Sequence, residues 1–331
     1  MKSIDEKRYD KILAEIKRNI NQAHEDEINR KELIKKIETH FCEYCDVKDN
    51  CNSKTCRAML YYAPTAPIDL QDILPFHSML NSVGVPECLV LIITSMGGIG
   101  PIAEKIVDLC YKHCKNQFIV VVPTFAKSAA TLIALSAKKI IMGETSELGP
   151  IDAQVPVMAG GIPQPISAQD YIDSRDELEE KIKNAVGKNE PIQSYLAQIT
   201  TLNQGYLKFC EHSMEFGRDF AKKKLDKKMF EKYQGEIPKA ELINEIAVNF
   251  SSRSKHMIHG RMITYDDIIE DQHLKHLNIK KLESDFKCWG WIEHLIIRAD
   301  IYLNLDNRPP VKKIKLLQST NFNMTCIGTQ G

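Results

Sequence analysis

The chain has 331 residues, and its 44 basic and 44 acidic side chains leave no formal net charge at pH 7. A neutral chain has no whole-molecule attraction to nucleic acid or to anionic membranes. It also contains no run of about 18 apolar residues, so no segment is predicted to span a bilayer. These properties predict a cytoplasmic protein with one sizeable core and several appendages, and no nucleic-acid partner.

The first region, residues 1–40, is predicted to be a helical arm. Apolar side chains recur there at helical spacing among Lys, Glu and Asp, namely Ile4, Tyr9, Ile12, Leu13, Ile16 and Ile20. Two interpretations fit this pattern. The arm is either a helix that packs on the protein's own core, or a hairpin that binds a regulatory partner or a second copy of the chain.

The next region, residues 41–57, holds a cluster of four cysteines: Cys42, Cys45, Cys51 and Cys56. Four thiolates at such short spacing can surround a metal ion, which would stabilise a segment with too few apolar residues for its own core. We predict a structural zinc site, although an iron–sulfur cluster would use the same ligands. Disulfides are the alternative, but no secretory signal is visible and the other six of the ten cysteines are scattered.

Alternating strand and helix patterns begin at about residue 58. Met59–Tyr62 is the first predicted strand. Leu89–Thr94 and Phe118–Val122 are continuous aliphatic and β-branched runs, typical of buried parallel strands, and Lys139–Met142 is a further strand. Helical segments separate the later strands. This order predicts right-handed crossovers and a mostly parallel sheet.

Two of these strands end in small-residue turns that open a helix. The first leads into Gly97 and Gly98, where the backbone can adopt positive φ or approach another group closely. The second leads into Ser128, just before the apolar helix Ala129–Leu135. A hydroxyl at a helix N-terminus can attack a carbonyl, and the glycine pair can aim N–H donors at the resulting oxyanion. Alternatively, Ser128 is merely an N-cap and the glycines form a tight turn.

Three ordered motifs, ITSMGG at 93–98, PTFAKSAATLIAL at 123–135 and MGETSELGPIDAQ at 142–154, resemble the serine dehydrogenase proteinase family. That family is related to signal peptide peptidase A and, more distantly, to the Clp protease/crotonase superfamily. A weaker match covers residues 256–279. The resemblance implies an α/β, Clp protease/crotonase-like core of repeated β-β-α and βαβ units with added helices. It also implies a homo-oligomer that cleaves peptide bonds, with Ser128 as nucleophile and oxyanion-hole amides from Gly97 and Gly98.

The general base is the least defined part of this prediction. Clp relatives place a histidine on the strand after the nucleophile helix, where this chain has Glu147–Asp152. Peptidases like signal peptide peptidase A use a lysine from a later segment or another subunit, which makes Lys181 and Lys183 candidates. The alternative, which the charged helical pattern favours, is that both lysines belong to a solvated helix face. His259 is a further candidate base, with a hydrogen-bonded structural histidine as its alternative.

Two other charged residues lie beside the motifs. Lys127 is expected to point away from the nucleophile, although it could assist electrostatically. Asp152 could orient a base or serve structurally. One sequence does not decide between these roles.

The sequence therefore divides into four regions: the arm at 1–40, the cysteine cluster at 41–57, the peptidase core at 58–285 and a C-terminal tail at 286–331. The core carries a helical insertion at about 168–249. A loop rich in glycine and proline is expected at 159–165. The last part of the tail, residues 312–331, is polar and poor in aromatic residues, so we expect it to be loosely ordered.

These features predict a serine endopeptidase that works through an acyl-enzyme on Ser128 and needs no catalytic cofactor. The ATPase signature G-x-x-x-x-G-K-[ST] does not occur in the sequence, so any unfolding motor would be a separate protein. The alternative is a catalytically silent scaffold or partner-binding module regulated through the cysteine cluster. An acyl-CoA enzyme of the crotonase type is disfavoured, because a serine at the helix start suits a peptidase better.

Overall fold

The fold is that of a computed structural model of the chain. The structure describes residues 23–44, 55–159, 161–252, 261–282, 287–304 and 311–329, together with Asp10, Lys11 and Ala14. Within these ranges, no helix is both long enough and apolar enough to cross a membrane.

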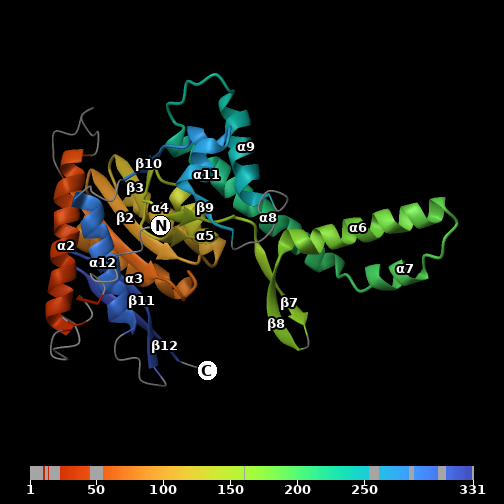
Figure 1. The fold of residues 1–331 in the computed structure, drawn as a ribbon, viewed down its shortest axis with the longest axis horizontal. Coiled ribbons are helices and arrows are strands. Elements are labelled where there is room, and N and C mark those ends of the chain that lie inside the picture. Colours follow the sequence, from red (N-terminus) through yellow and green to blue (C-terminus); the bar gives the residue numbers. More distant parts are fainter. Residues whose placement is uncertain are drawn as a thin grey trace.

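The core of the molecule is a 10-stranded sheet whose main path is β10-β5-β3-β2-β1-β11-β12 (Figure 1). Along this path the strands from β10 to β1 are parallel to their neighbours. Their bounds are β10, Ile279–Lys281; β5, Lys139–Met142; β3, Gln117–Val122; β2, Cys88–Ser95; and β1, Cys56–Ala63. The predicted mostly parallel sheet is therefore confirmed.

Three short strands extend the sheet beyond the carboxyl end of β2. They are β4 (Phe125–Ala126), β6 (Glu147–Leu148) and β9 (Ile263–Thr264). β4 is parallel to both β2 and β6, and β9 is antiparallel to β6. Because the carboxyl edge of a parallel α/β sheet is where ligands bind, this extension places the segments after β2 and β4 at the edge that matters for function.

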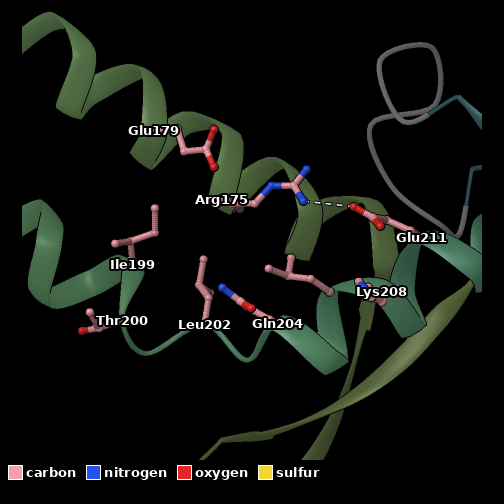
Figure 2. Close-up of a pocket in the computed structure, with 9 residues that line it drawn as sticks. Arg175, Glu179, Ile199, Thr200, Leu202, Gln204, Lys208 and Glu211 are labelled. Atoms are coloured by element: carbon pink, nitrogen blue, oxygen red, sulfur yellow. Dashed lines mark hydrogen bonds and ion pairs between the residues drawn. The ribbon is translucent and has the colours of Figure 1, made fainter.

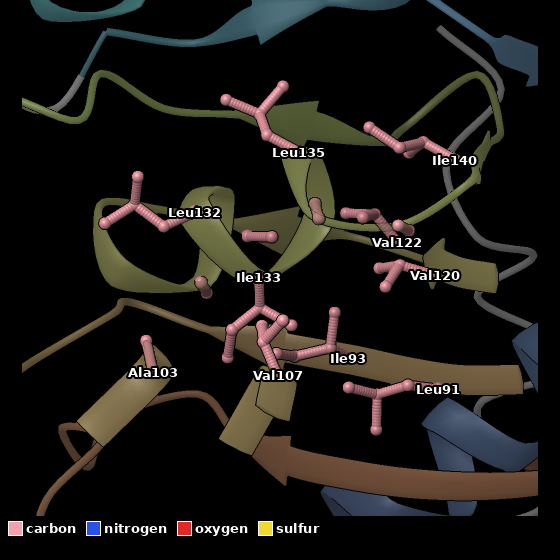
Figure 3. Close-up of a cluster of buried hydrophobic side chains, with 14 of the residues drawn as sticks. Leu91, Ile93, Ala103, Val107, Val120, Val122, Leu132, Ile133, Leu135 and Ile140 are labelled. Carbon is pink, nitrogen blue, oxygen red and sulfur yellow. The ribbon is translucent and has the colours of Figure 1, made fainter. Parts of the chain in front are cut away.

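Helices cover both faces of the sheet, which is why the central strands are apolar on both sides. On one face, Leu91 and Ile93 of β2 join a cluster that includes Val107 and Ile133 from the helices (Figure 3). The helices on this face are α3 (Ile73–Val83), α4 (Gly100–Lys112), α5 (Ala129–Leu135), the end of α8 (Gln204–Lys224) and α9 (Lys239–Ser251).

The opposite face is covered by α2 (Ala23–Tyr44) and α12 (Lys287–Asn304) (Figure 1). Ile34 and Ile37 of α2 are fully buried against the sheet and α12. For Ala23–Tyr44, the interpretation of a helix that packs on its own core is therefore correct. Most of the predicted arm before this helix lies outside the described residues.

The C-terminal tail corrects the sequence-based expectation, because it is an integral part of the sheet. β11 (Val311–Ser319) pairs antiparallel with β1, and β12 (Asn323–Thr329) pairs with β11. Leu316 and Leu317 are fully buried, and the ammonium of Lys315 lies 2.8 Å from Asp72 Oδ2. The polar composition of the tail was misleading, because Lys315 is buried together with its partner Asp72 inside the core.

The helical insertion forms a second arm, distinct from the N-terminal one, that projects from the core (Figure 1). It contains the hairpin β7 (Gln154–Ala159) and β8 (Ile162–Ser167), then α6 (Ala168–Gly187), α7 (Gln193–Ile199) and the first part of α8. The loop predicted at 159–165 is thus mostly a strand. Proline is tolerated there because each strand of a two-stranded hairpin is an edge strand, in which alternate N–H groups face away from the partner strand.

The remaining elements complete the core. A single turn of π-helix, η3 (Leu225–Met229), follows α8. The short helices η2 (Leu70–Asp72), α11 (Tyr265–Glu270) and η4 (Leu274–His276) are connectors. α11 and η4 directly precede β10.

Candidate active site

The turns after β2 and β4 lie next to each other at the carboxyl edge of the sheet. Ser95, at the end of β2, pairs with Ala126, at the end of β4. The Lys127 amide then donates a hydrogen bond of 2.9 Å to the Ser95 carbonyl. This pairing brings Gly97 and Gly98 to the turn that carries Ser128, as the two sequence motifs predict.

Both glycines are required by their surroundings. Gly97 has φ 93° and Gly98 has φ 150°. A Cβ on Gly97 would lie 2.4 Å from the Lys127 carbonyl oxygen and 2.8 Å from Ser128 Cβ, and one on Gly98 would lie 2.3 Å from the Ile68 carbonyl oxygen. The glycine turn therefore contacts the serine turn through its backbone, which no larger residue would allow.

Ser128 is held in an unusual backbone conformation at the start of α5. Its φ is 50° and its ψ is −118°, and its side chain makes no capping hydrogen bond to the helix. For a residue with a Cβ this conformation costs roughly 1–3 kcal/mol, and such strain occurs preferentially at functional sites. A serine on a sharp strand-to-helix turn is the arrangement that exposes a nucleophilic hydroxyl in α/β-hydrolases. The interpretation as a simple N-cap does not explain this geometry.

The backbone amides around Ser128 differ in their availability. The Gly97 N–H donates a 3.1 Å hydrogen bond to Ser95 Oγ. Within the part of the chain that the structure describes, the amides of Gly98 and Ala129 donate no hydrogen bond. Ala129 is the first residue of α5, so its N–H belongs to the unpaired donors of a helix N-terminus.

Ser128 faces a pocket of about 850 Å³. Its walls come from the two turns, the start of α4, the segment 151–154 and one face of α8. Much of the lining is apolar, and Met96, Ile99 and Phe209 remain about half exposed. Among the described residues that line it, the ionisable ones are Asp152 and His212.

His212 is a residue that the sequence prediction missed. It lies on α8 within the pattern Phe209, His212, Ser213 and Phe216, all of which line the pocket. This helical spacing is visible in the sequence, but only the fold brings these four side chains to the pocket that Ser128 also lines.

Lys127 points away from Ser128, as expected. Its ammonium lies 2.8 Å from Glu147 Oε1, and it also donates to the carbonyl oxygens of Leu148 and Arg261 at 3.2 and 3.3 Å. These contacts use all three N–H donors of the lysine, and the side chain is buried. Lys127 therefore ties β6 to the serine turn.

The other predicted bases are not brought to the pocket of Ser128 in this chain. Lys181 and Lys183 lie on the exposed surface of α6, and Lys181 pairs with Glu177 across 3.7 Å. A separate hollow of about 560 Å³ lies between α6 and α8, where Arg175 bonds Glu211 (Figure 2), and neither lysine lines it. His259 lies outside the described residues.

The cysteine cluster is only partly described. Cys45 and Cys51 lie outside the described residues, and for Cys42 the structure gives only its place near the end of α2. Cys56 begins β1 and is buried in the apolar layer between the sheet and α2. Among the described residues no group of three or more His, Cys, Asp or Glu could hold a metal ion. With most of the predicted ligand set undescribed, the zinc site stays a prediction.

A parallel-sheet α/β core, a strained serine at a strand-to-helix turn and a glycine turn against it define the Clp protease/crotonase-like class of fold. Residues 79–177 match the family model described as ClpP-like SDH-type serine proteinase. The matched segment contains all three sequence motifs, so this similarity agrees with the family that the motifs resemble.

Similar proteins are known from sequence and from structure. Two uncharacterized proteins of Methanocaldococcus jannaschii are 40% and 45% identical to the chain over 65 residues. The matched region is 20% of this chain and 22% of each relative, so the chain spans about a fifth of their length.

Two similar solved structures are mutants of the 1510-N membrane-bound stomatin-specific protease. One is a serine-to-alanine mutant, with 12% identity and a TM-score of 0.39 over 70% of this chain and 79% of that chain. The other is a lysine-to-alanine mutant in complex with a substrate peptide, with 15% identity and a TM-score of 0.27 over 72% and 97% of the two chains.

Proposed function

We propose that the protein is a serine endopeptidase in which Ser128 attacks the carbonyl carbon of a peptide bond. The observation that carries this proposal is the conformation of Ser128, whose strained φ of 50° presents an uncapped hydroxyl at the pocket. The family match over residues 79–177 supports the same reaction.

In the proposed reaction, a base removes the proton of Ser128 Oγ as the oxygen bonds to the substrate carbonyl carbon. The oxyanion that forms would face the amides of Gly98 and Ala129, which have no other hydrogen-bond acceptor in the described part of the chain. The amine leaves with a proton, and water then hydrolyses the acyl-enzyme. Because Gly97 has no side chain, the glycine turn can lie directly against the turn that carries Ser128.

The pocket supports a peptide or protein substrate with an apolar residue near the cleaved bond, since Met96, Ile99 and Phe209 present apolar surface beside Ser128. The reaction needs no nucleotide and no organic cofactor. We also propose that the protein works as a homo-oligomer and that the cysteine cluster holds a structural zinc ion.

The test is labelling with a fluorophosphonate probe, with the adduct detected by intact mass. The wild type should gain one adduct, and Ser128→Ala should gain none. Ser213→Ala is the matched control, because Ser213 lines the same pocket but its hydroxyl donates to the Phe209 carbonyl at 2.7 Å. Failure of the folded wild type to label would instead favour the catalytically silent scaffold.

A further inference from the structure

We infer that His212 is the general base for Ser128 and that Asp152 positions its imidazole. This inference rests on the proposed function and supplies the group that the sequence leaves open. Among the described residues that line the pocket, Asp152 and His212 are the ionisable ones. No lysine is among the described residues that line the pocket. The ammonium of Lys127 forms an ion pair with Glu147, which does not line the pocket either.

The face of α8 that carries His212 is fixed against the catalytic turns. Phe209, His212, Ser213 and Phe216 recur at intervals that place them on one helical face, and all four line the pocket. Phe216 packs on the first residue of α4, since a Cβ on Gly100 would lie 2.9 Å from its ring. His212 precedes Phe216 by four residues, a rise of roughly 6 Å along the helix.

Asp152 is held beside the same part of α8. The segment that contains it runs antiparallel to the helix: a Cβ on Gly217 would lie 3.2 Å from the Ile151 carbonyl oxygen, and Tyr206 donates to the Pro156 carbonyl. Between these contacts, the Ala153 amide donates to Met214 Sδ at 3.3 Å. Asp152 therefore lies next to the helical turn that bears His212, and it is only 3% exposed.

These positions fit the roles of a base and its orienting carboxylate. The imidazole would take the Ser128 proton as the Oγ–C bond forms and return it to the leaving nitrogen as the C–N bond breaks. In the second half it would take a proton from the attacking water and return it to Ser128 Oγ as the acyl C–Oγ bond breaks. The Asp152 carboxylate would favour one ring orientation and stabilise the imidazolium. Along its own helix, the charged residues nearest to His212 are Lys208, Glu211 and Glu215.

The experiment measures the rate of fluorophosphonate labelling at Ser128 together with peptide hydrolysis. In His212→Ala both rates should fall by roughly 10²–10⁴-fold, the contribution of a general base. Added imidazole should restore part of the loss, which a merely structural role would not allow. His212→Gln, which preserves size and polarity, should lose as much. Asp152→Asn should show a smaller loss and a pH–rate profile displaced from that of the wild type.

Three comparison variants separate this assignment from the alternatives. Lys181→Ala, Lys183→Ala and His259→Ala should label at the wild-type rate. The inference is overturned if His212→Ala and His212→Gln label as fast as the wild type, or if one of the comparison variants loses the reaction instead. Failure of the wild type itself to label would sink the proposed function, so the two failures are distinguishable.

Discussion

At the scale of single residues, the contact between Gly97 and the serine turn makes a testable difference between two glycines. Gly97→Ala should destabilise the protein and abolish labelling, because the new Cβ would overlap Lys127 and Ser128 atoms. Gly84→Ala is the matched control: Gly84 also has positive φ, 75°, but its Cβ would meet no atom within 4 Å.

Urea denaturation and probe labelling measure the two effects. Gly84→Ala should lose about 1 kcal/mol of unfolding free energy, the cost of a strained φ, and label normally. Gly97→Ala should lose clearly more unfolding free energy than Gly84→Ala. Equal losses in the two variants, with labelling retained in both, would show that the close approach at Gly97 is unimportant.

Much of this site was predictable at the residue scale. Gly97, Gly98 and Ser128 each follow a strongly apolar strand, and the local pattern is enough to place them at strand ends. His212 was not predictable in the same way. Its position opposite Ser128 depends on how α8 packs across α4 and on the path of the segment after β6, and neither is a local property of the sequence.

At the scale of elements, the joint between α2 and β1 predicts a specific pH dependence. Glu38 of α2 is 6% exposed and accepts a 3.0 Å hydrogen bond from the Ala58 amide of β1. Burial raises the pKa of this carboxyl above its ordinary value of 4.5. The folded protein therefore holds this proton more tightly than the unfolded chain, and the wild type loses stability as pH rises from 4.5 through the raised pKa.

Glu38→Gln tests this dependence, because glutamine keeps an oxygen that can accept the Ala58 hydrogen bond but carries no charge. The variant should be more stable than the wild type at pH 7, and the difference should shrink toward acid pH. Urea unfolding across this range gives the measurement. Glu177→Gln on the exposed surface of α6 should show no comparable trend. A stability difference for Glu38→Gln that is independent of pH would contradict the argument.

The cysteine segment is the second element with a testable expectation. The purified protein should contain one zinc ion per chain by elemental analysis, and Cys45→Ser should reduce that content and lower the thermal midpoint. Cys326→Ser is the control, since Cys326 lies on β12 outside the predicted ligand set. One iron-containing cluster, or full zinc content in Cys45→Ser, would refute the prediction.

Elements also show where composition fails as a guide. The end of the chain is polar, yet β11 is buried in the sheet because Lys315 pairs with Asp72 and Gln318 accepts a 2.7 Å hydrogen bond from Arg30. The partners of these side chains lie on η2 and α2, far away in sequence. Local composition does not reveal the long-range pairing of buried polar groups. The apolar strands β2 and β3, in contrast, can be predicted from their local sequence.

At the scale of the whole molecule, the sheet and its helices form one body and the insertion forms a projecting arm (Figure 1). The arm buries little: α7 has no buried residue, and α6 buries only Ala168, Ile172, Leu178 and Ala185. Val186 and Leu196 are exposed apolar residues on it. This surface is compatible with the predicted homo-oligomer, which stays a prediction.

One helix belongs to both parts of the molecule. The beginning of α8 builds the arm with α6, while its later turns bury Phe220 and Ala221 against the core, and the face between them forms the wall opposite Ser128. A continuous helix transmits force along its axis with little bending. A partner bound to the arm would therefore contact the same helix that lines the pocket of Ser128.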